Sequence, residues 1–246
     1  RVLREADYLI TNTPVMLRNF IENNRDIEGL GKKFCFISNG YDMDDFRDLP
    51  VPGGENEKFT MTYTGLLYGQ RKPDTLFEAV RRLISGKAIN AEEIRIKLIG
   101  NYKEGYINGL IEKYGLSGIV EVYPYMKHSE CLKHLVSSDA LLHIEGNAPG
   151  SEAFYSGKIF EYMNTGRPVL AIIPKNGAAA QLIRETRIGL VSDSDDVEQT
   201  MENIKKLYEM WQNKVSGFDP DREKIARYER KVLTGELADI FNKLVK

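Results

Sequence analysis

The stretch 156-SGKIFEYMNTGRPVLAII-173 carries the clearest structural pattern in the chain. Ser156 and Gly157 are good residues for starting a helix, and Gly166 followed by Pro168 is a good signal for ending one. The predicted helix is short and leads directly into an apolar run of strand length. A helix joined so closely to a buried strand is typical of a parallel α/β sheet.

The rest of the chain repeats this alternation of apolar runs and helical segments. Strands are expected near residues 7–12, 33–38, 59–64, 94–99, 119–123, 139–144, 168–173 and 188–192. Helices are expected near 14–24, 73–85, 104–114, 128–137, 156–165, 176–186 and 195–213, and two more polar helices near 220–229 and 230–245. The pattern predicts an α/β fold with a Rossmann-like parallel sheet flanked by helices.

Composition suggests a boundary after Phe46, where the sequence 47-RDLPVPGGENEK-58 is rich in proline, glycine and charge, as linkers are. Residues 1–50 then form a short unit that is too small to bury a core alone. Residues 51–219 hold six strand candidates, which is enough for a complete doubly wound sheet. Residues 220–246 close the chain with helices.

The bulk composition excludes several classes of function. The formal net charge of the 246 residues is −2, which makes no electrostatic case for nucleic acid. No apolar run reaches the roughly 18 residues that a membrane helix needs, and the first residues are too polar for a signal peptide. Cys35 and Cys131 lack metal-type spacing, so we interpret them as reduced core thiols, which favours a cytoplasmic location. A chain that starts at Arg1 without methionine suggests part of a longer protein.

In a doubly wound sheet, ligands bind beyond the carboxyl ends of the strands, at the point where the strand order reverses. The first turn of the helix at 156–165 exposes free backbone N–H groups and the positive end of the helix dipole, and Gly157 leaves the backbone open. We therefore expect a phosphate site there. Glu161, about one turn into the helix, could accept hydrogen bonds from ribose hydroxyls, or it could be a capping carboxylate that only favours the dipole.

The segment 64-TGLLYGQRKPDTLFEAV-80 is a second candidate, because a strand ends there and a glycine-bearing loop leads to a helix. Gly65 and Gly69 allow the loop to approach a ligand closely. Arg71 and Lys72 could neutralise a diphosphate, or they could be an ordinary solvated basic pair. The glycine spacing is not a dinucleotide-binding fingerprint.

The segment 144-IEGNAPGSEAFYSGK-158 is a long, polar, glycine-rich loop that leads into the candidate phosphate helix. Such a loop is either functional or mobile. Its two acids, Glu145 and Glu152, are open to a catalytic or a merely solvated role. The three histidines form no nucleophile or metal constellation, and we interpret them as structural or surface residues: His128, His134 and His143.

Taken in order, these segments resemble the retaining group 1 glycosyltransferases, whose GT-B fold has two Rossmann-like domains. The resemblance is carried by 6-ADYLITNT-13, 37-ISNGYDMDDF-46, 64-TGLLYGQRKPDTLFEAV-80, 96-IKLIG-100, 125-YMKHSECLKHLVSSDALL-142, 157-GKIFEYMNTGRPVLA-171 and 186-TRIGLVSDSDD-196. It implies that residues 51–219 are the nucleotide-sugar-binding domain. Residues 1–50 would be a remnant of the acceptor-binding domain with its linker, and residues 220–246 would be helices that cross back toward that domain.

The resemblance also implies roles for single residues. Those expected to bind the donor are Gly65, Tyr125, Met126, Ser156, Gly157, Lys158, Ile159 and Glu161, and those expected to act in catalysis are Arg71, Lys72 and Glu152. The diphosphate would meet Gly157 and Lys158, largely through backbone N–H groups, and Glu161 would hold the ribose. The backbone near Tyr125 and Met126 would meet the base. The loop at 147–153 would face the transferred sugar.

Two positions depart from the family pattern. The family commonly has two glutamates separated by seven residues, and counting back from Glu161 places the first at Ala153, with Glu152 one position away. The family also often has an arginine after the glycine of the third strand, where this chain has Leu66 after Gly65. The first departure leaves the sugar-contacting carboxylate open, and the second leaves the basic loop with more phosphate charge to balance.

The resemblance implies transfer of a sugar from a nucleotide sugar to an acceptor hydroxyl with retention, in polysaccharide or glycolipid synthesis. A nucleotide-diphosphate sugar would be the donor substrate, and neither a metal nor another cofactor is expected. The partner would be an acceptor saccharide or lipid-linked saccharide, with peripheral contact at the inner face of the membrane in the longer protein, and not nucleic acid. We expect this chain to bind donor without turnover.

Two other functions stay open. The first is an inactive nucleotide-sugar-binding or regulatory module, which the departures at Ala153 and Leu66 favour. The second is an unrelated Rossmann-like enzyme, such as a sugar-nucleotide epimerase of GT-B shape. The sequence 157-GKIFEY-162 argues against the second.

Overall fold

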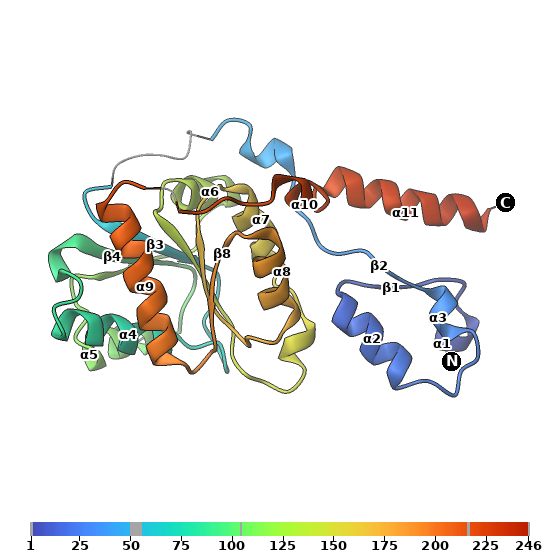
Figure 1. The fold of residues 1–246 in the computed structure, drawn as a ribbon, viewed down its shortest axis with the longest axis horizontal. Helices are drawn as coiled ribbons and strands as arrows, with labels where there is room; N and C mark the ends of the chain where they lie inside the picture. The colour runs from blue at the N-terminus through green and yellow to red at the C-terminus, as the bar shows by residue number, and fades with distance from the viewer. Residues whose placement is uncertain (1, 50–55, 104, 216, 246) are drawn as a thin grey trace.

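The computed structural model describes residues 2–49, 56–103, 105–215 and 217–245, which form two parallel sheets with helices around them (Figure 1). The larger sheet has the strand order β5-β4-β3-β6-β7-β8. Its strands are β3 (Phe59–Thr64), β4 (Ile94–Ile99), β5 (Val120–Tyr123), β6 (Ala140–Ile144), β7 (Val169–Ile172) and β8 (Gly189–Ser192). All six coincide with strands predicted from the sequence, which confirms the parallel α/β fold class.

Five helices connect the strands, a sixth follows β8, and together they cover both faces of this sheet. They are α4 (Asp74–Ser85), α5 (Tyr106–Lys113), α6 (His128–Val136), α7 (Lys158–Asn164), α8 (Ala178–Thr186) and α9 (Val197–Gln212). Helices α4, α5 and α9 pack in one apolar core, and α6, α7 and α8 pack in a second core on the other face. Because both faces are covered, the central strands are buried along almost their whole length, as is usual in parallel sheets.

The order of the strands reverses between β3 and β6. From β3 the chain adds β4 and β5 on one side, and from β6 it adds β7 and β8 on the other. The loops that follow β3 and β6 therefore leave the sheet in opposite directions. This is the position at which open α/β sheets bind their ligands.

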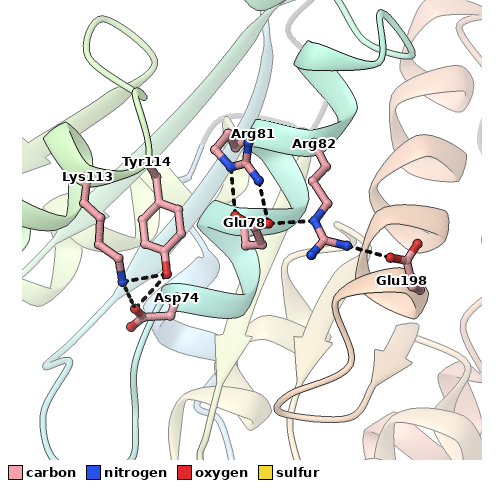
Figure 2. Close-up of polar contacts among 7 residues, drawn as sticks. All are labelled: Asp74, Glu78, Arg81, Arg82, Lys113, Tyr114 and Glu198. Carbon is pink, nitrogen blue, oxygen red and sulfur yellow. Dashed lines mark hydrogen bonds and ion pairs between the residues drawn. The ribbon is translucent and has the colours of Figure 1, made fainter.

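Helix α4 carries a charged face that ties it to α9 (Figure 2). The Glu78 carboxylate accepts two hydrogen bonds from Arg81, at 2.8 and 2.7 Å, and one from Arg82 at 2.6 Å. Arg82 also donates to Glu198 at the start of α9, at 2.7 Å. These two hydrogen-bonded arginines hold the pKa of Glu78 at about 2.

The first turn of α4 is tied to the end of α5 in the same way (Figure 2). The Tyr114 hydroxyl donates to Asp74 at 2.9 Å, and the Lys113 ammonium lies 3.4 Å from the same carboxylate oxygen. An acid in the first turn also suits the positive end of the α4 dipole. The basic loop that precedes α4 is thus anchored at its far end.

The smaller sheet pairs β1 (Leu9–Thr11) with β2 (Phe34–Phe36) in parallel, and both strands coincide with predicted ones. Around it lie α1 (Val2–Glu5), α2 (Pro14–Glu22) and α3 (Leu30–Lys33). Leu30 supplies the one buried apolar side chain of residues 2–36, all of which are described. This part of the chain therefore lacks a core of its own, as its length suggests.

The last helices, α10 (Arg222–Ala226) and α11 (Arg230–Leu244), return toward this smaller sheet (Figure 1). Tyr41 exchanges backbone hydrogen bonds with their junction, donating to Tyr228 at 3.1 Å and accepting from Arg230 at 2.8 Å. The pKa of the Cys35 thiol in β2 is raised by burial and by Glu236 of α11. None of the helices in the described ranges is long and apolar enough to cross a membrane.

Some elements differ from the prediction. Helix α10 is shorter than the expected 220–229, and short turns that carry no periodic signal were not predicted: α1, α3, η1 (Met43–Phe46), η2 (Ala91–Glu93) and η3 (Ser151–Ala153). The boundary predicted at residues 50 and 51 lies outside the described residues. The division at 1–50, 51–219 and 220–246 stays a prediction.

Glu78 is expected to stabilise the protein at neutral pH but not in strong acid. Because its pKa is lowered from 4.5 to about 2, its contribution is present above pH 4.5 and is lost as the pH falls through about 2. Glu78→Gln should melt roughly 1–3 °C below the wild type at pH 7, a modest change because the network is at the surface, and the gap should close near pH 2.

Circular-dichroism melts across this pH range measure the effect. Glu112→Gln, an exposed glutamate of α5 without an ion pair in the described ranges, is the matched control and should melt like the wild type throughout. Equal melting of Glu78→Gln and wild type at pH 7 would contradict the role of this network.

Candidate functional site

The site begins where the pairing of β3 with β6 ends. The two strands pair only through Met61 with Ala140 and Thr62 with Leu141. Beyond that point the end of β3 is bonded to helix α7 instead: the Tyr162 hydroxyl lies 3.0 Å from the Thr64 hydroxyl and 3.3 Å from its backbone nitrogen. Side chains from the first turns of α7 therefore lie between the two strand ends, and we call this place the crevice.

Lys158 extends from the start of α7 into this crevice. Its ammonium donates to the Thr64 carbonyl at 2.6 Å and lies 4.1 Å from the centre of the Tyr63 ring. Gly65 has a positive φ of 110°, which favours glycine, and a Cβ atom there would stand 2.9 Å from the Lys158 nitrogen and displace it. The expected role of Lys158 rested largely on its backbone, whereas the structure brings its side chain into the site.

Burial in this crevice, and after it the charge of Arg71, together lower the pKa of Lys158 to about 7. Glu145 and Glu161 act against this shift. Near neutral pH the amine thus changes its charge readily when an anion comes close.

The loops after β3 and β6 meet at Arg71 and Glu145. The Arg71 guanidinium lies 3.7 Å from the Glu145 carboxylate, and it stands over the Tyr68 ring at 5.6 Å. The loops touch so closely that a Cβ atom at Gly146 would lie 2.1 Å from the carbonyl oxygen of Gln70. Two loops that the sequence singled out separately therefore form one site.

His143, the fourth residue of β6, lies beneath this pair. Its ring is fully buried, and neither ring nitrogen makes a hydrogen bond to a described residue, although Nε2 is 3.5 Å from Glu145. Burial, and after it the charge of Lys158, keep the pKa of His143 well below its usual value. The pKa of Glu145 is raised by burial despite its two cationic neighbours. His143 is neutral and structural, as expected, but it forms part of the floor of the site.

The N-terminus of α7 offers free donors. Within the described residues the backbone N–H groups of Gly157 and Lys158 donate no hydrogen bond, and Gly157 is exposed. The N–H of Ile159 is already bonded to the Ser156 carbonyl at 3.2 Å, and the Ile159 side chain is buried in the core. Two of the four predicted residues here thus have amides without an acceptor among the described residues.

Glu161 is already paired in this structure. Its carboxylate lies 3.0 Å from Nε2 of His128, the first residue of α6. We interpreted His128 as a surface or structural residue, and the structure places it beside a predicted ribose ligand. Residue spacing could not show this, because 33 positions separate the two residues.

The predicted base-binding segment lies at the end of β5. Tyr125 is 73% exposed, and its backbone N–H donates to the Asn101 side chain at 3.3 Å. The carbonyl of Met126 accepts a long contact of 3.9 Å from the Cys131 thiol. A cavity of about 420 Å³ lies beside Asn101, between the ends of β4 and β5. No sequence pattern pointed to Asn101.

The loop at 147–153 is fixed at both ends. Asn147 donates to Asp193 at 3.2 Å, and the Thr13 hydroxyl, from the N-terminal part of the chain, donates to the Ala153 carbonyl at 2.6 Å. Both Thr13 and Ala153 are buried. Glu152, which precedes Ala153, is exposed. The carboxylate that lies beside a cation of the site is therefore that of Glu145, and not that of Glu152.

Other parts of the molecule fit an active site less well. A cavity of about 630 Å³ lies at the opposite edge of the sheet, next to Phe59, Trp211 and Phe218, where no predicted site residue is found. Ligands of open parallel sheets bind at the carboxyl edge, which this cavity does not reach. Lys72 is exposed on the basic loop. Among the described residues, no cluster of His, Cys, Asp and Glu could hold a metal ion.

The crevice, the cations and the open helix end can be compared with known proteins. The model of the family described as glycosyl transferases group 1 matches residues 44–232, just over three quarters of the chain. The chain belongs to the group 1 glycosyltransferases. No curated protein sequence matches it.

Several solved glycosyltransferase structures have the same fold. The Anabaena protein HepE in complex with UDP is 18% identical, with a TM-score of 0.71, over 98% of this chain and 65% of that one. A glycosyltransferase from Rickettsia africae is 14% identical, with a TM-score of 0.73, over 98% and 64%. This chain thus spans slightly less than two thirds of these proteins.

Gly146→Ala is expected to destabilise the protein and to disturb the site. The added methyl group would meet the Gln70 backbone at 2.1 Å, so one of the two loops must shift, at a cost of about 1–3 kcal/mol. Gly109→Ala, an exposed position in α5 with open space around its Cβ, is the matched control. It should raise stability by about 0.5–1 kcal/mol.

Chemical denaturation of both variants measures the two free energies of unfolding. Equal stability of Gly146→Ala and the wild type would show that the loops after β3 and β6 do not meet as described.

Proposed function

We propose that this chain is the donor-binding part of an enzyme that transfers a sugar from a nucleotide-diphosphate sugar to an acceptor hydroxyl. The observation that carries the proposal is the convergence of two cationic side chains, Arg71 and Lys158, with the free amides of Gly157 and Lys158 at the point where the strand order reverses. Family membership supports the reaction class.

In the proposed reaction, the bond between the anomeric carbon and the leaving phosphate oxygen breaks. Negative charge builds on the diphosphate as the sugar becomes oxocarbenium-like. Arg71, Lys158 and the N-terminus of α7 would stabilise this charge, and groups already held in place do so without reorganisation. The leaving diphosphate and the incoming hydroxyl would share one face of the sugar, which gives retention. Neither a metal nor another cofactor is part of this proposal.

The remaining donor contacts follow from the placement of each residue. Glu161 would accept hydrogen bonds from the ribose, with His128 holding its carboxylate. The base would lie against the backbone of Tyr125 and Met126, beside Asn101. The loop at 147–153, including Glu152, would face the sugar. The complexes of HepE with UDP and with UDP-glucose support a uridine donor as the first to test.

The acceptor would bind to a part of the fold beyond this chain, which spans less than two thirds of its structural relatives. We propose a saccharide or lipid-linked saccharide as acceptor, in polysaccharide or glycolipid synthesis in the cytoplasm or at the inner face of the membrane. The chain alone would then bind donor without transferring the sugar.

A nucleotide-sugar-binding module without transferase activity is the second candidate. It is favoured by Ala153, which is buried and bonded to Thr13 where the family commonly has a carboxylate, and by the exposed Leu66 where it often has an arginine. The convergence of Glu145, Arg71 and Lys158 favours the transferase, because it restores a carboxylate and cations to the same crevice.

One nucleotide should stabilise this chain against heat. We would compare UDP, GDP, ADP, CMP and dTDP, and expect a clear shift with UDP. Ligand at about 100 times its dissociation constant adds roughly 2.7 kcal/mol, which is several degrees for a chain of this size.

Glu161→Ala should abolish that shift, because it removes the ribose contact. Glu223→Ala, an exposed helical glutamate of α10, is the matched control and should leave the shift intact. No shift with any nucleotide would count against a donor site in this chain.

Sugar transfer is expected to be absent when this chain alone is mixed with UDP-glucose and saccharide acceptors. Release of UDP at a rate above the buffer background, measured by a coupled assay, would contradict the separation of donor and acceptor binding. Binding of UDP-glucose without release of UDP would agree with this separation.

A further inference from the structure

Glu145 has no contact with the donor in the roles assigned above. It follows the last residue of β6, its side chain is only 10% exposed, and its carboxylate is 3.7 Å from Arg71 and 3.5 Å from His143. The charge of Lys158 also acts on it. The carboxylate is thus paired with one of the two cations that the proposed function assigns to the donor's diphosphate, and it lies within the electrostatic influence of the other.

The charges around Glu145 determine how the site responds to an incoming anion. Two cations held together in a partly buried crevice repel each other, and a buried carboxylate needs a cationic partner to stay ionised. Without ligand, Glu145 pairs with Arg71, and its charge also acts on Lys158, whose ammonium is bonded to the Thr64 carbonyl. A diphosphate at the same cations places its own negative charge next to Glu145, and two anions in so small a space compete for the same partners.

We propose that Glu145 is the internal counter-ion that Arg71 and Lys158 exchange for the donor's diphosphate, and that the site takes up a proton from solvent when the exchange occurs. This inference rests on the proposed function, because it needs a diphosphate at these cations. The proton goes to the Lys158 amine, or to the carboxylate of Glu145, and no bond other than that to the proton is made.

The charged and titratable side chains around Glu145 and Lys158 come from four elements. Arg71 comes from the loop after β3, Tyr63 from β3, His143 from β6, and Lys158 and Glu161 from α7. Burial raises the pKa of Tyr63 and lowers that of His143, so both are neutral near pH 7.

Lys158 can therefore gain a proton near pH 7, and the shift of Glu145 favours its protonated form. The pKa of Lys158 is about 7 in the empty site, lowered by burial and then by Arg71, and that of Glu145 is raised by burial. An incoming anion raises both values.

The sign of the pH dependence follows from linkage. Because donor binding raises the pKa of Lys158 above about 7, the affinity is full at lower pH and falls as the pH rises through 7. At pH 7 about half of the Lys158 amines are neutral in the empty site, so about half a proton or more should be taken up.

The test is calorimetric titration of the chain with UDP-glucose, whose phosphates are diesters and do not titrate in this range. Titrations at pH 7 in PIPES and in imidazole, which differ in their enthalpy of ionisation, give the number of protons exchanged. Titrations between pH 6 and pH 8 give the affinity profile.

Glu145→Gln separates a competing counter-ion from a residue that positions Arg71. Removing a competing negative charge should tighten UDP-glucose binding, by about three- to tenfold for one partly screened charge pair. It should also change the proton uptake: upward where Lys158 takes the proton, because Glu145 raises the pKa of Lys158 in the empty site, and downward where Glu145 itself takes it. Loss of a positioning residue should weaken binding and leave the uptake unchanged. The control is Glu121→Gln, which breaks a carboxylate–arginine pair with Arg95 (2.9 Å) on edge strand β5 and should change neither quantity.

Tighter binding by Glu145→Gln with a changed uptake supports the exchange. Weaker binding by this variant, or wild-type binding without proton uptake, overturns it and leaves the proposed function standing. Absence of UDP-glucose binding by the wild type overturns both the uridine donor and the exchange. If Glu145→Gln does not fold, the proton uptake and the pH profile of the wild type still decide.

Discussion

The short pairing of β3 with β6 is the constraint on which the rest of the site depends. Asp139 fixes the start of this pair: its backbone N–H donates to the Thr60 carbonyl at 2.9 Å, and its carboxylate accepts from the Thr60 amide at 2.8 Å. Past Thr62 and Leu141 no further register is shared. The unpaired groups of Thr64 must find other partners, and Tyr162 and Lys158 of α7 supply them.

This arrangement ties the position of the helix end to the sheet. Since the Lys158 ammonium is bonded to β3, the first turn of α7 cannot move without breaking a hydrogen bond in a low-dielectric crevice. The backbone amides of Gly157 and Lys158, which donate no hydrogen bond within the described residues, lie at this end of the helix. An anion site of the proposed kind would be prepared before its ligand arrives, which is the condition for electrostatic stabilisation of a developing charge.

Preparing such a site is costly for the empty protein. Burial pushes the amine of Lys158 toward its neutral form and the carboxyl of Glu145 toward its protonated form, and His143 lies below them without a hydrogen-bond partner among the described residues. These shifts oppose the charged state that a diphosphate needs. Helix packing elsewhere, such as the ties of α4 to α5 and α9 in Figure 2, holds the surrounding frame. Ionisable groups whose pKa values are shifted by burial thus concentrate at the candidate site, as they do in many enzymes.

The sequence by itself determined the parallel α/β class, all eight strands and the main helices, because alternation of apolar runs is a local property. Local signals also located the helix end at Gly157, the basic loop at Arg71 and Lys72, and, through family resemblance, Glu161. Only the tertiary structure decided that Glu145 rather than Glu152 lies among the cations, that the Lys158 side chain bonds β3, and that His128 pairs with Glu161. These contacts join residues from different loops and helices. Their distances depend on how the strands are ordered and how the helices pack, which no local pattern in the chain encodes.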